Sequence, residues 1–252
     1  MRKKTQQPPV HQRLVALTQP ESWEAESFRG MRYVVNNLLA SRAAAEHTNT
    51  TDAGARVFGV TSPAESEGKT TIAVNLAAVL AESPEKKVLL LDTDMRASRM
   101  ELYLGEPRDH VGLRDALRNT ALSLRSVLRR PQRGRFFWVS AGAPVEKGAH
   151  VLLQSPQLGR LLGEARKLFD YVVLDTAPIL PVTDCQSIAP HVDGFLMVVR
   201  AHRTPRTLLA QSLERLEPEK LLGLVFNADD SPVSGHGYYK KYYRRDDARR
   251  PG

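Results

Sequence analysis

The residues best suited to chemistry are Gly68, Lys69 and Thr70, which stand at a sharp change of sequence pattern. Residues 56–61 are apolar and rich in β-branched side chains, as in a buried strand, whereas residues 62–67 are mostly small or polar. From Lys69 onward the apolar residues are spaced as on one face of a helix. A loop that enters a helix in this way directs several backbone N–H groups to one place, where the helix dipole favours phosphate. The sequence therefore predicts a phosphate-binding loop.

In such a loop Lys69 is expected to contact the β- and γ-phosphates of a nucleotide, and Thr70 to offer a hydroxyl to Mg²⁺. The pattern G-x-x-x-x-G-K-[ST] is incomplete, because Pro63 stands where the first glycine belongs. The plain alternative is a strand–loop–helix unit with a surface lysine. The order of buried strand, loop and amphipathic helix favours the nucleotide site. The backbone N–H groups expected to bind phosphate belong to Ser66, Glu67, Gly68, Lys69, Thr70 and Thr71.

Two further strand-like segments end in aspartate. Val88–Leu91 leads to Asp92 and Asp94, and Tyr171–Leu174 leads to Asp175. Because ligands bind at the carboxyl ends of parallel strands, these carboxylates are expected beside the phosphate-binding loop. There they are suited to hold Mg²⁺ or to take a proton from an attacking hydroxyl, and the sequence leaves open whether Asp92 or Asp94 is the base. The alternative is acidic residues in ordinary turns.

The segments alternate between strands and helices, which predicts an α/β fold with a mostly parallel central sheet covered by helices on both faces. The expected strands are residues 56–61, 88–91, 136–139, 171–174, 194–199 and 221–226. The expected helices are residues 22–45, a helix starting at 69, and residues 155–169, 184–189 and 205–216. Residues 97–135 are expected to form short amphipathic segments. The predicted domain organisation is a flexible N-terminal arm over 1–19, one domain over 20–230 whose first helix occupies 20–46, and a disordered tail over 231–252.

The composition fits one large α/β domain. The chain has 252 residues, of which 42% are hydrophobic and 25% charged, and it contains no apolar run long enough to cross a membrane. A single cysteine, Cys185, excludes an internal disulfide and favours a reduced cytoplasm. The seven histidines show no metal-ligand spacing.

The net charge of +8 is concentrated in two stretches, Arg125–Arg135 and Ser231–Gly252. Neither stretch is laid out as a recognition helix, and no zinc-binding or helix-turn-helix pattern accompanies them. The sequence therefore disfavours nucleic acid as a partner and favours contact with an anionic membrane surface.

The tail over 231–252 contains four of the chain's seven tyrosines, Tyr238, Tyr239, Tyr242 and Tyr243. It has many charges and no apolar periodicity, which predicts disorder. A tyrosine cluster in such a segment indicates modification, stacking on a partner, or chance. The flanking Lys and Arg residues would offset part of the charge that each added phosphate brings.

Two other features leave alternatives open. Glu26, Arg29 and Arg32 are spaced three apart on the predicted first helix, so they can form i,i+3 ion pairs on a solvated face. Asn227 ends the last predicted strand, where it is either a contact for an adenine ring or a turn residue.

Taken together, the motifs resemble the bacterial tyrosine kinase (BY-kinase) family of capsule and exopolysaccharide assembly, over nearly the whole chain. The loop TSPAESEGKTT is similar to the family's TSxxPGEGKST, LLLDTDMR meets its apolar-DxDxR motif in full, and YVVLDTAP meets its third motif. The early helix carries the family's E-x-x-R-x-x-R element as Glu26, Arg29 and Arg32, which implies a subunit contact in a ring.

Two departures from the family pattern stand out, and a third position separates the chain from a related group. Ser66 replaces the usual glycine of the loop, which implies a less well shaped loop or weaker activity because serine tolerates fewer backbone conformations. After Arg96 the segment ASRM replaces the family's proline and histidine. Ala64 stands where the related MinD/ParA group of cytoskeletal ATPases has an extra lysine, which argues against that group.

The resemblance implies a P-loop NTPase fold of MinD/ParA-like architecture and an ATP-dependent protein-tyrosine autokinase that uses Mg²⁺. It implies Lys69, Asp92, Asp94 and Asp175 as catalytic residues, and Thr70, Asp92 and Asp175 as metal ligands. The tail tyrosines would be phosphorylated in trans within a homo-oligomeric ring, and this would regulate exopolysaccharide or capsule polymerisation and export. The implied partners are a membrane chain-length regulator (a polysaccharide co-polymerase) that activates the kinase and a protein-tyrosine phosphatase. The protein would be cytoplasmic and peripheral at the inner face of the cell membrane through that regulator.

Two rival functions belong to other classes. The first is an ATP-binding switch or scaffold of a membrane polysaccharide assembly that has no kinase activity. The second, weaker one is a ParA-like ATPase that uses its basic patches on DNA, whose binding would weaken steeply with salt.

Overall fold

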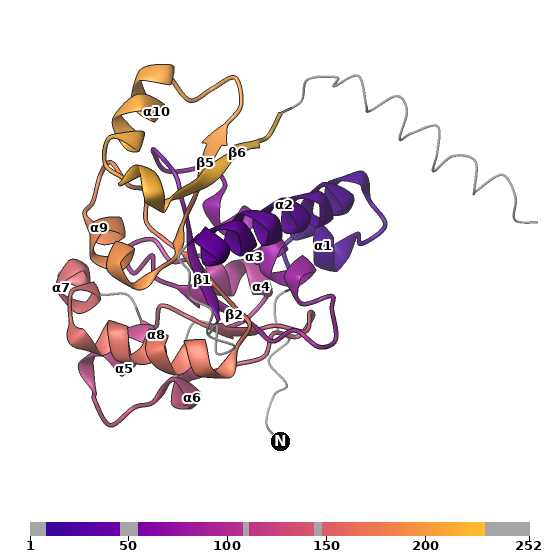
Figure 1. Cartoon of the computed structure of the whole chain (residues 1–252). Helices are drawn as coiled ribbons and strands as arrows, with labels where there is room; N and C mark the ends of the chain where they lie inside the picture. Colours follow the sequence, from indigo (N-terminus) through magenta and orange to yellow (C-terminus); the bar gives the residue numbers. More distant parts are fainter. Residues whose placement is uncertain (1–8, 46–54, 108–110, 144–147, 230–252) are drawn as a thin grey trace, which may run out of the picture.

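The computed structural model describes residues 9–45, 55–107, 111–143 and 148–229 (Figure 1). A six-stranded parallel sheet has the order β3-β2-β4-β1-β5-β6. The strands are β1 (Arg56–Thr61), β2 (Val88–Asp92), β3 (Phe137–Val139), β4 (Tyr171–Asp175), β5 (Gly194–Arg200) and β6 (Leu221–Asn227). The predicted α/β fold with a parallel sheet is confirmed, and each strand lies within one residue of its predicted bounds.

Helices cover both faces of the sheet (Figure 1). The helices are α1 (Val15–Thr18), α2 (Trp23–Ala45), α3 (Lys69–Leu80), α4 (Met100–Leu104), α5 (Leu113–Arg118), α6 (Leu124–Val127), α7 (Ala149–Leu153), α8 (Pro156–Leu168), α9 (Asp184–Ile188), α10 (Arg206–Leu213) and the short 3-10 helices η1 (Ala189–His191) and η2 (Pro218–Lys220). Within the described ranges, no helix is both long and apolar enough to span a membrane.

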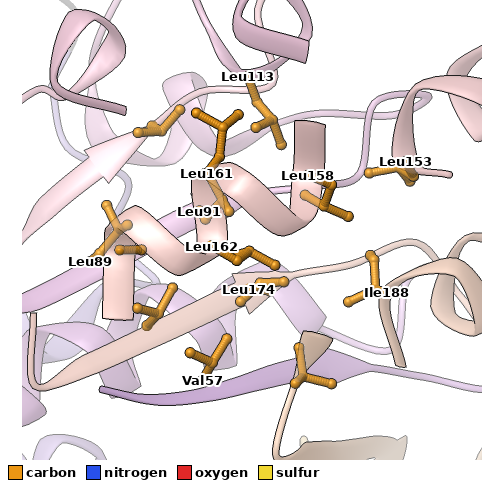
Figure 2. Packing of buried hydrophobic residues seen from close by; sticks show 14 of the residues in the cluster. Val57, Leu89, Leu91, Leu113, Leu153, Leu158, Leu161, Leu162, Leu174 and Ile188 are labelled. Atoms are coloured by element: carbon orange, nitrogen blue, oxygen red, sulfur yellow. The ribbon is translucent and has the colours of Figure 1, made fainter. Parts of the chain in front are cut away.

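The alternation of side chains along the strands divides the core into two clusters. Leu89 and Leu91 of β2 point to the face covered by α5, α8 and α9, where they meet Leu158 and Leu161 (Figure 2). The neighbouring Leu90 points to the other face, which α2 and α3 cover. Strands buried on both faces have the continuous apolar runs that the sequence shows.

The strand order brings the ends of β2 and β4 together. Asp92 and Asp175 are register partners at the last position of these two neighbouring strands. Because β1 lies on the other side of β4, the loop that follows β1 begins beside the same carboxylates. The sheet thus places all three predicted motifs together at the carboxyl ends of its strands.

The described part of the predicted N-terminal arm, residues 9–19, is packed on α3. Leu14 is fully buried. The side-chain amide of Asn75 binds the segment through both its oxygen and its nitrogen. Asn75 Oδ1 accepts a hydrogen bond from the backbone N–H of Ala16 at 2.9 Å, and Asn75 Nδ2 donates to the carbonyl of Arg13 at 2.9 Å. The expectation of flexibility therefore does not hold for residues 9–19, because Leu14 is buried in the core and Ala16 and Leu17 pack against it.

Replacing Leu14 with alanine should lower the free energy of unfolding by about 2–5 kcal/mol, because a fully buried leucine is removed from the core. Urea denaturation measures the change. Leu102→Ala is the matched control, since Leu102 is 52% exposed and its loss should cost about 0.5 kcal/mol or less. Equal effects of the two substitutions would show that the segment does not contribute to the core.

Candidate active site

The phosphate-binding loop ends at Gly68, the residue that caps the N-terminus of α3. Gly68 has φ of 102°, and no side chain caps the first turn of the helix. A Cβ atom at this position would lie 2.0 Å from Nδ2 of Asn227, so only glycine fits. The backbone N–H groups at the start of α3 are thus left for a ligand, as a phosphate site requires.

Ser66 adopts a left-handed backbone with φ of 63°, at the position where the family usually has glycine. This conformation brings Cβ close to the following carbonyl oxygen and costs a residue other than glycine roughly 1–2 kcal/mol. The loop therefore keeps the backbone shape that glycine would give it, but under strain.

The side chain of Glu67 ties the loop to the far strands. Its buried carboxylate accepts hydrogen bonds from the backbone N–H of Arg200 at 2.5 Å and from the hydroxyl of Thr204 at 2.6 Å. The carbonyl of Glu67 accepts a further bond from Nδ2 of Asn227 at 2.8 Å. Sequence analysis assigned Glu67 only a backbone role and missed Thr204, because no spacing rule connects residues more than 130 positions apart.

Asp92 and Asp175 form a buried pair of like charge. Among the residues that the structure describes, none gives a hydrogen bond to Oδ1 of Asp175, which is costly for a buried carboxylate and suits a site that binds a cation. Burial raises the pKa of Asp175 to about 7, although Lys69 and a hydrogen bond from Thr70 oppose that rise. Burial and the neighbouring Asp175 also raise the pKa of Asp92 well above its ordinary value.

Asp92 is held at both oxygens. Its Oδ1 accepts a bond from the backbone N–H of Asp94 at 3.0 Å, and its Oδ2 accepts one from the hydroxyl of Ser98 at 2.6 Å. The same hydroxyl lies 3.1 Å from Oε2 of the buried Glu101. Ser98 belongs to the segment that departs from the family pattern, so this chain supports Asp92 with a residue that the family comparison did not single out.

A cleft brings the loop and the second motif together. It is lined by Glu65, Ser66, Gly68, Lys69, Thr70, Asp94, Arg96, Ala97, Arg99, Tyr103, Ala177, Pro178, Pro181 and Val182. Nε of Arg96 lies 3.4 Å from Oδ2 of the buried Asp184, which directs that arginine along one wall. The cleft therefore has phosphate-binding groups on one side and the Asp94 carboxylate on another.

Oxygen ligands for a hard cation are available at this end of the sheet. Thr70, Asp92 and Asp175 supply a hydroxyl and two carboxylates, the donor types that Mg²⁺ prefers together with phosphate oxygens and water. In the part of the chain that the structure describes, no three His, Cys, Asp or Glu side chains gather into a metal site of their own. A magnesium ion here would need the phosphates of a bound nucleotide to complete its ligands.

The remaining predicted residues lie elsewhere. Glu26 and Arg29 form the predicted i,i+3 ion pair at 3.0 Å, on α2 and away from the cleft. Arg29 and Arg32 also pair with Glu82, just after α3, at 3.0 and 2.9 Å. The tail tyrosines Tyr238, Tyr239, Tyr242 and Tyr243 lie outside the described residues.

Comparison with known proteins agrees with this geometry. Residues 58–236 match the CobQ/CobB/MinD/ParA nucleotide-binding domain family (CbiA). The chain is 34% identical over 220 residues to the succinoglycan biosynthesis transport protein ExoP of Rhizobium meliloti, covering 86% of this chain and 26% of ExoP. It is 31% identical to the tyrosine-protein kinase YwqD of Bacillus subtilis, covering 91% of this chain and 92% of YwqD. The solved kinase domain of the Escherichia coli tyrosine kinase ETK superposes with a TM-score of 0.71 at 26% identity, covering 88% of this chain and 83% of that domain.

Replacing Ser66 with glycine should raise the free energy of unfolding by up to about 1 kcal/mol. The relief of the left-handed strain exceeds the extra chain entropy that glycine loses on folding, about 0.5–1 kcal/mol. Thermal or urea denaturation checks the sign. Ser66→Ala keeps the Cβ atom and should bring no gain, and a gain of the same size in both variants would contradict the strain.

The unusual pKa of Asp175 predicts a pH dependence in the protein without Mg²⁺. The ordinary pKa is 3.8 and the folded value is about 7, so between these values the folded state holds a proton that the unfolded state has lost. The contribution to stability is complete below pH 4 and is lost as the pH rises to about 7. The free energy of unfolding of Asp175→Asn, relative to wild type, should therefore rise by roughly 1.4 kcal/mol per pH unit across this window.

Urea denaturation at several pH values measures the difference. Asp170→Asn is the control, because hydrogen bonds and charge from Lys86 and Lys87 lower the pKa of Asp170 in the folded state. The contribution of Asp170 to stability is constant above its ordinary pKa. The free energy of unfolding of Asp170→Asn should therefore differ from that of wild type by a constant amount in the same window. A constant difference in the free energy of unfolding for Asp175→Asn as well would mean that Asp175 is ionised across the whole pH window.

Proposed function

The chain belongs to the bacterial tyrosine kinase family, and from that membership we propose that it is an ATP-dependent protein-tyrosine autokinase. The observation that carries the proposal is the cleft in which the predicted phosphate-binding loop faces the Asp94 carboxylate, close to the buried strand-end pair Asp92 and Asp175. A loop alone would serve any nucleotide-binding protein. The carboxylates add groups that can hold a metal and accept a proton, as phosphoryl transfer to a hydroxyl requires.

The backbone N–H groups from Ser66 to Thr71 would hold the phosphates of ATP, and Lys69 would bridge its β- and γ-phosphates. Lys69 is 92% buried and lies close enough to Asp175 to oppose the rise in the pKa of that carboxyl. A charge held in this position is ready for a phosphate and needs little reorganisation.

Thr70, Asp92 and Asp175 would hold Mg²⁺, which when bound would neutralise charge that develops on the phosphates. Asp94 would then accept the proton of the tyrosine hydroxyl while the phenolic oxygen bonds to the γ-phosphorus and ADP leaves. Asp94 is preferred to Asp92 for this role because it lines the cleft, whereas Asp92 is fully buried with hydrogen bonds at both oxygens. A phenol has an ordinary pKa near 10, so a base beside it lowers the barrier.

The acceptors would be the tail tyrosines Tyr238, Tyr239, Tyr242 and Tyr243 of a neighbouring subunit. Head-to-tail contacts of identical chains close into a ring when the rotation permits. Glu26, Arg29 and Arg32 would form part of that contact. The side chain of Glu26 is 43% exposed although it pairs with Arg29, so it is accessible to a second subunit.

The membership also supports a place in exopolysaccharide or capsule production. ExoP is named for succinoglycan biosynthesis and transport, and this chain spans only about a quarter of its length. A membrane chain-length regulator would activate the kinase at the inner face of the cell membrane, and a protein-tyrosine phosphatase would reverse its action. Phosphorylation of the tail would loosen the ring, because added phosphates repel the carboxylates of the neighbouring site.

One observation favours a second candidate, an ATP-binding switch or scaffold without kinase activity. Ser66 keeps the loop in a strained conformation, and slow or incomplete closing of the loop around ATP would leave binding without efficient transfer. In that case the nucleotide would alter the assembly of the protein while the tail stays unmodified.

Lys69→Met should reduce tail phosphorylation at least about 100-fold, because one buried cation at the transferred phosphate is lost. Mass spectrometry of the full chain after incubation with Mg²⁺ and ATP measures the phosphate on each tail tyrosine. Lys167→Met is the matched control, since this exposed lysine on α8 is remote from the cleft.

Phosphate that persists on the tail of purified Lys69→Met would reject the proposed site. A wild-type tail that stays unmodified with Mg²⁺-ATP and the activating membrane partner, while ATP still binds, would favour the switch.

A further inference from the structure

A long stretch of the chain carries positive charge that the proposed kinase site does not use. Residues 116–145 contain no aspartate or glutamate and no lysine, but they contain six arginines. We call these residues the arginine edge; they are Arg118, Arg125, Arg129, Arg130, Arg133 and Arg135. We propose that the arginine edge docks the protein directly on an anionic membrane surface through the phosphates of lipid headgroups.

The fold gathers these residues at one end of the molecule. The segment runs from the end of α5 through α6 and turns back outside β3, which is the edge strand of the sheet (Figure 1). Arg129 pairs with Trp138 of β3 in an antiparallel bridge, and Arg130 stacks on the ring of Phe137 with 4.4 Å between guanidinium carbon and ring centroid. Arg129 and Arg130 therefore lie against the edge strand, whereas Arg118 and Arg125 belong to α5 and α6.

The side chains are available to a partner. All of them are exposed except that of Arg129, which is partly buried. Within the described ranges none of the six takes part in an ion pair. Two acidic groups that contact this segment have other partners: Glu106 accepts from the backbone of Gln132 at 3.2 Å, and Glu164 pairs with Arg160 at 2.5 Å.

The chemistry and shape favour lipid headgroups. Guanidinium groups match phosphate oxygens with paired hydrogen bonds, and their weak hydration suits an interface. The arginine edge is built from turns and two helices of only four and six residues, so it offers no long helix to a nucleic-acid groove. Exposed charges that are spread over turns and two short helices can meet a lipid surface with several groups at once.

The N-terminus adds to this end of the molecule. Leu17 lies against Gly134, and Gly105 accepts a hydrogen bond from Gln132 at 3.0 Å, which places α1 and α4 beside the arginine edge.

The test compares two triple variants with equal net charge. Arg125→Gln, Arg133→Gln and Arg135→Gln remove three charges from the arginine edge. Arg203→Gln, Arg206→Gln and Arg215→Gln remove three exposed arginines at and around α10, at the other end of the molecule (Figure 1). Sedimentation of the full chain with vesicles of phosphatidylcholine and phosphatidylglycerol, and with vesicles of phosphatidylcholine alone, measures the affinity.

Each arginine near an anionic surface should contribute about a fivefold factor in affinity, so the edge variant should bind about 100-fold more weakly. The α10 variant should stay close to wild type, and replacing the three edge arginines with lysine should retain most of the binding. Binding should need phosphatidylglycerol and weaken with salt. Equal losses in the two glutamine variants, or no binding of wild type to anionic vesicles, would overturn the proposal, as would tighter binding to DNA than to vesicles.

This inference does not depend on the kinase assignment. Tail phosphorylation in solution should be the same in wild type and in all three triple variants, because none of the replaced residues lines the cleft. A failure of Lys69→Met to lower phosphorylation would thus leave the vesicle result unaffected, and the reverse also holds.

Discussion

The active site depends on one electrostatic constraint, the buried juxtaposition of Asp92 and Asp175 at the ends of two neighbouring strands. A parallel sheet fixes this pairing through its backbone hydrogen bonds, so the carboxylates cannot move apart. Burial raises the pKa of both carboxyls, and the charge of Asp175 raises that of Asp92 further. Lys69 supplies one cation, and the unpartnered oxygen of Asp175 leaves a place for another. The same repulsion that is costly without a ligand therefore favours metal and nucleotide together.

In the predicted phosphate-binding loop, backbone strain is balanced by hydrogen bonds. Ser66 stores strain, and Glu67 beside it holds two short hydrogen bonds to the β5 end and the following turn. Hydrogen bonds to a charged group contribute about 1.5–3 kcal/mol each, which is enough to hold one left-handed serine in place. The loop thus keeps its shape through distant contacts rather than through a permissive residue. Its geometry depends on β5 and β6 as much as on its own sequence.

The local sequence pattern was sufficient to predict the sheet, because buried parallel strands have continuous apolar runs. It also predicted that the three motifs lie close together, because the carboxyl ends of parallel strands meet at one end of the sheet. It was not sufficient for α1, because the apolar run Leu14–Leu17 has only four residues and is too short to show a helical period. The contacts of Glu67 and Ser98 were equally invisible, because they join side chains through folding rather than through spacing. The family pattern identified Ser66 as a departure, but only the backbone angle shows that serine adopts the conformation of the glycine it replaces.

The order of the strands also separates the surfaces that the two proposals use. The arginine edge lies outside β3, whereas the chain leaves the sheet from β6 at the opposite side. The cleft lies between them, at the carboxyl ends of the strands. A membrane held at β3 would therefore leave the cleft open to a neighbouring subunit. Docking and phosphoryl transfer are thus compatible in one fold, because a parallel sheet has two edges and only one ligand-binding end.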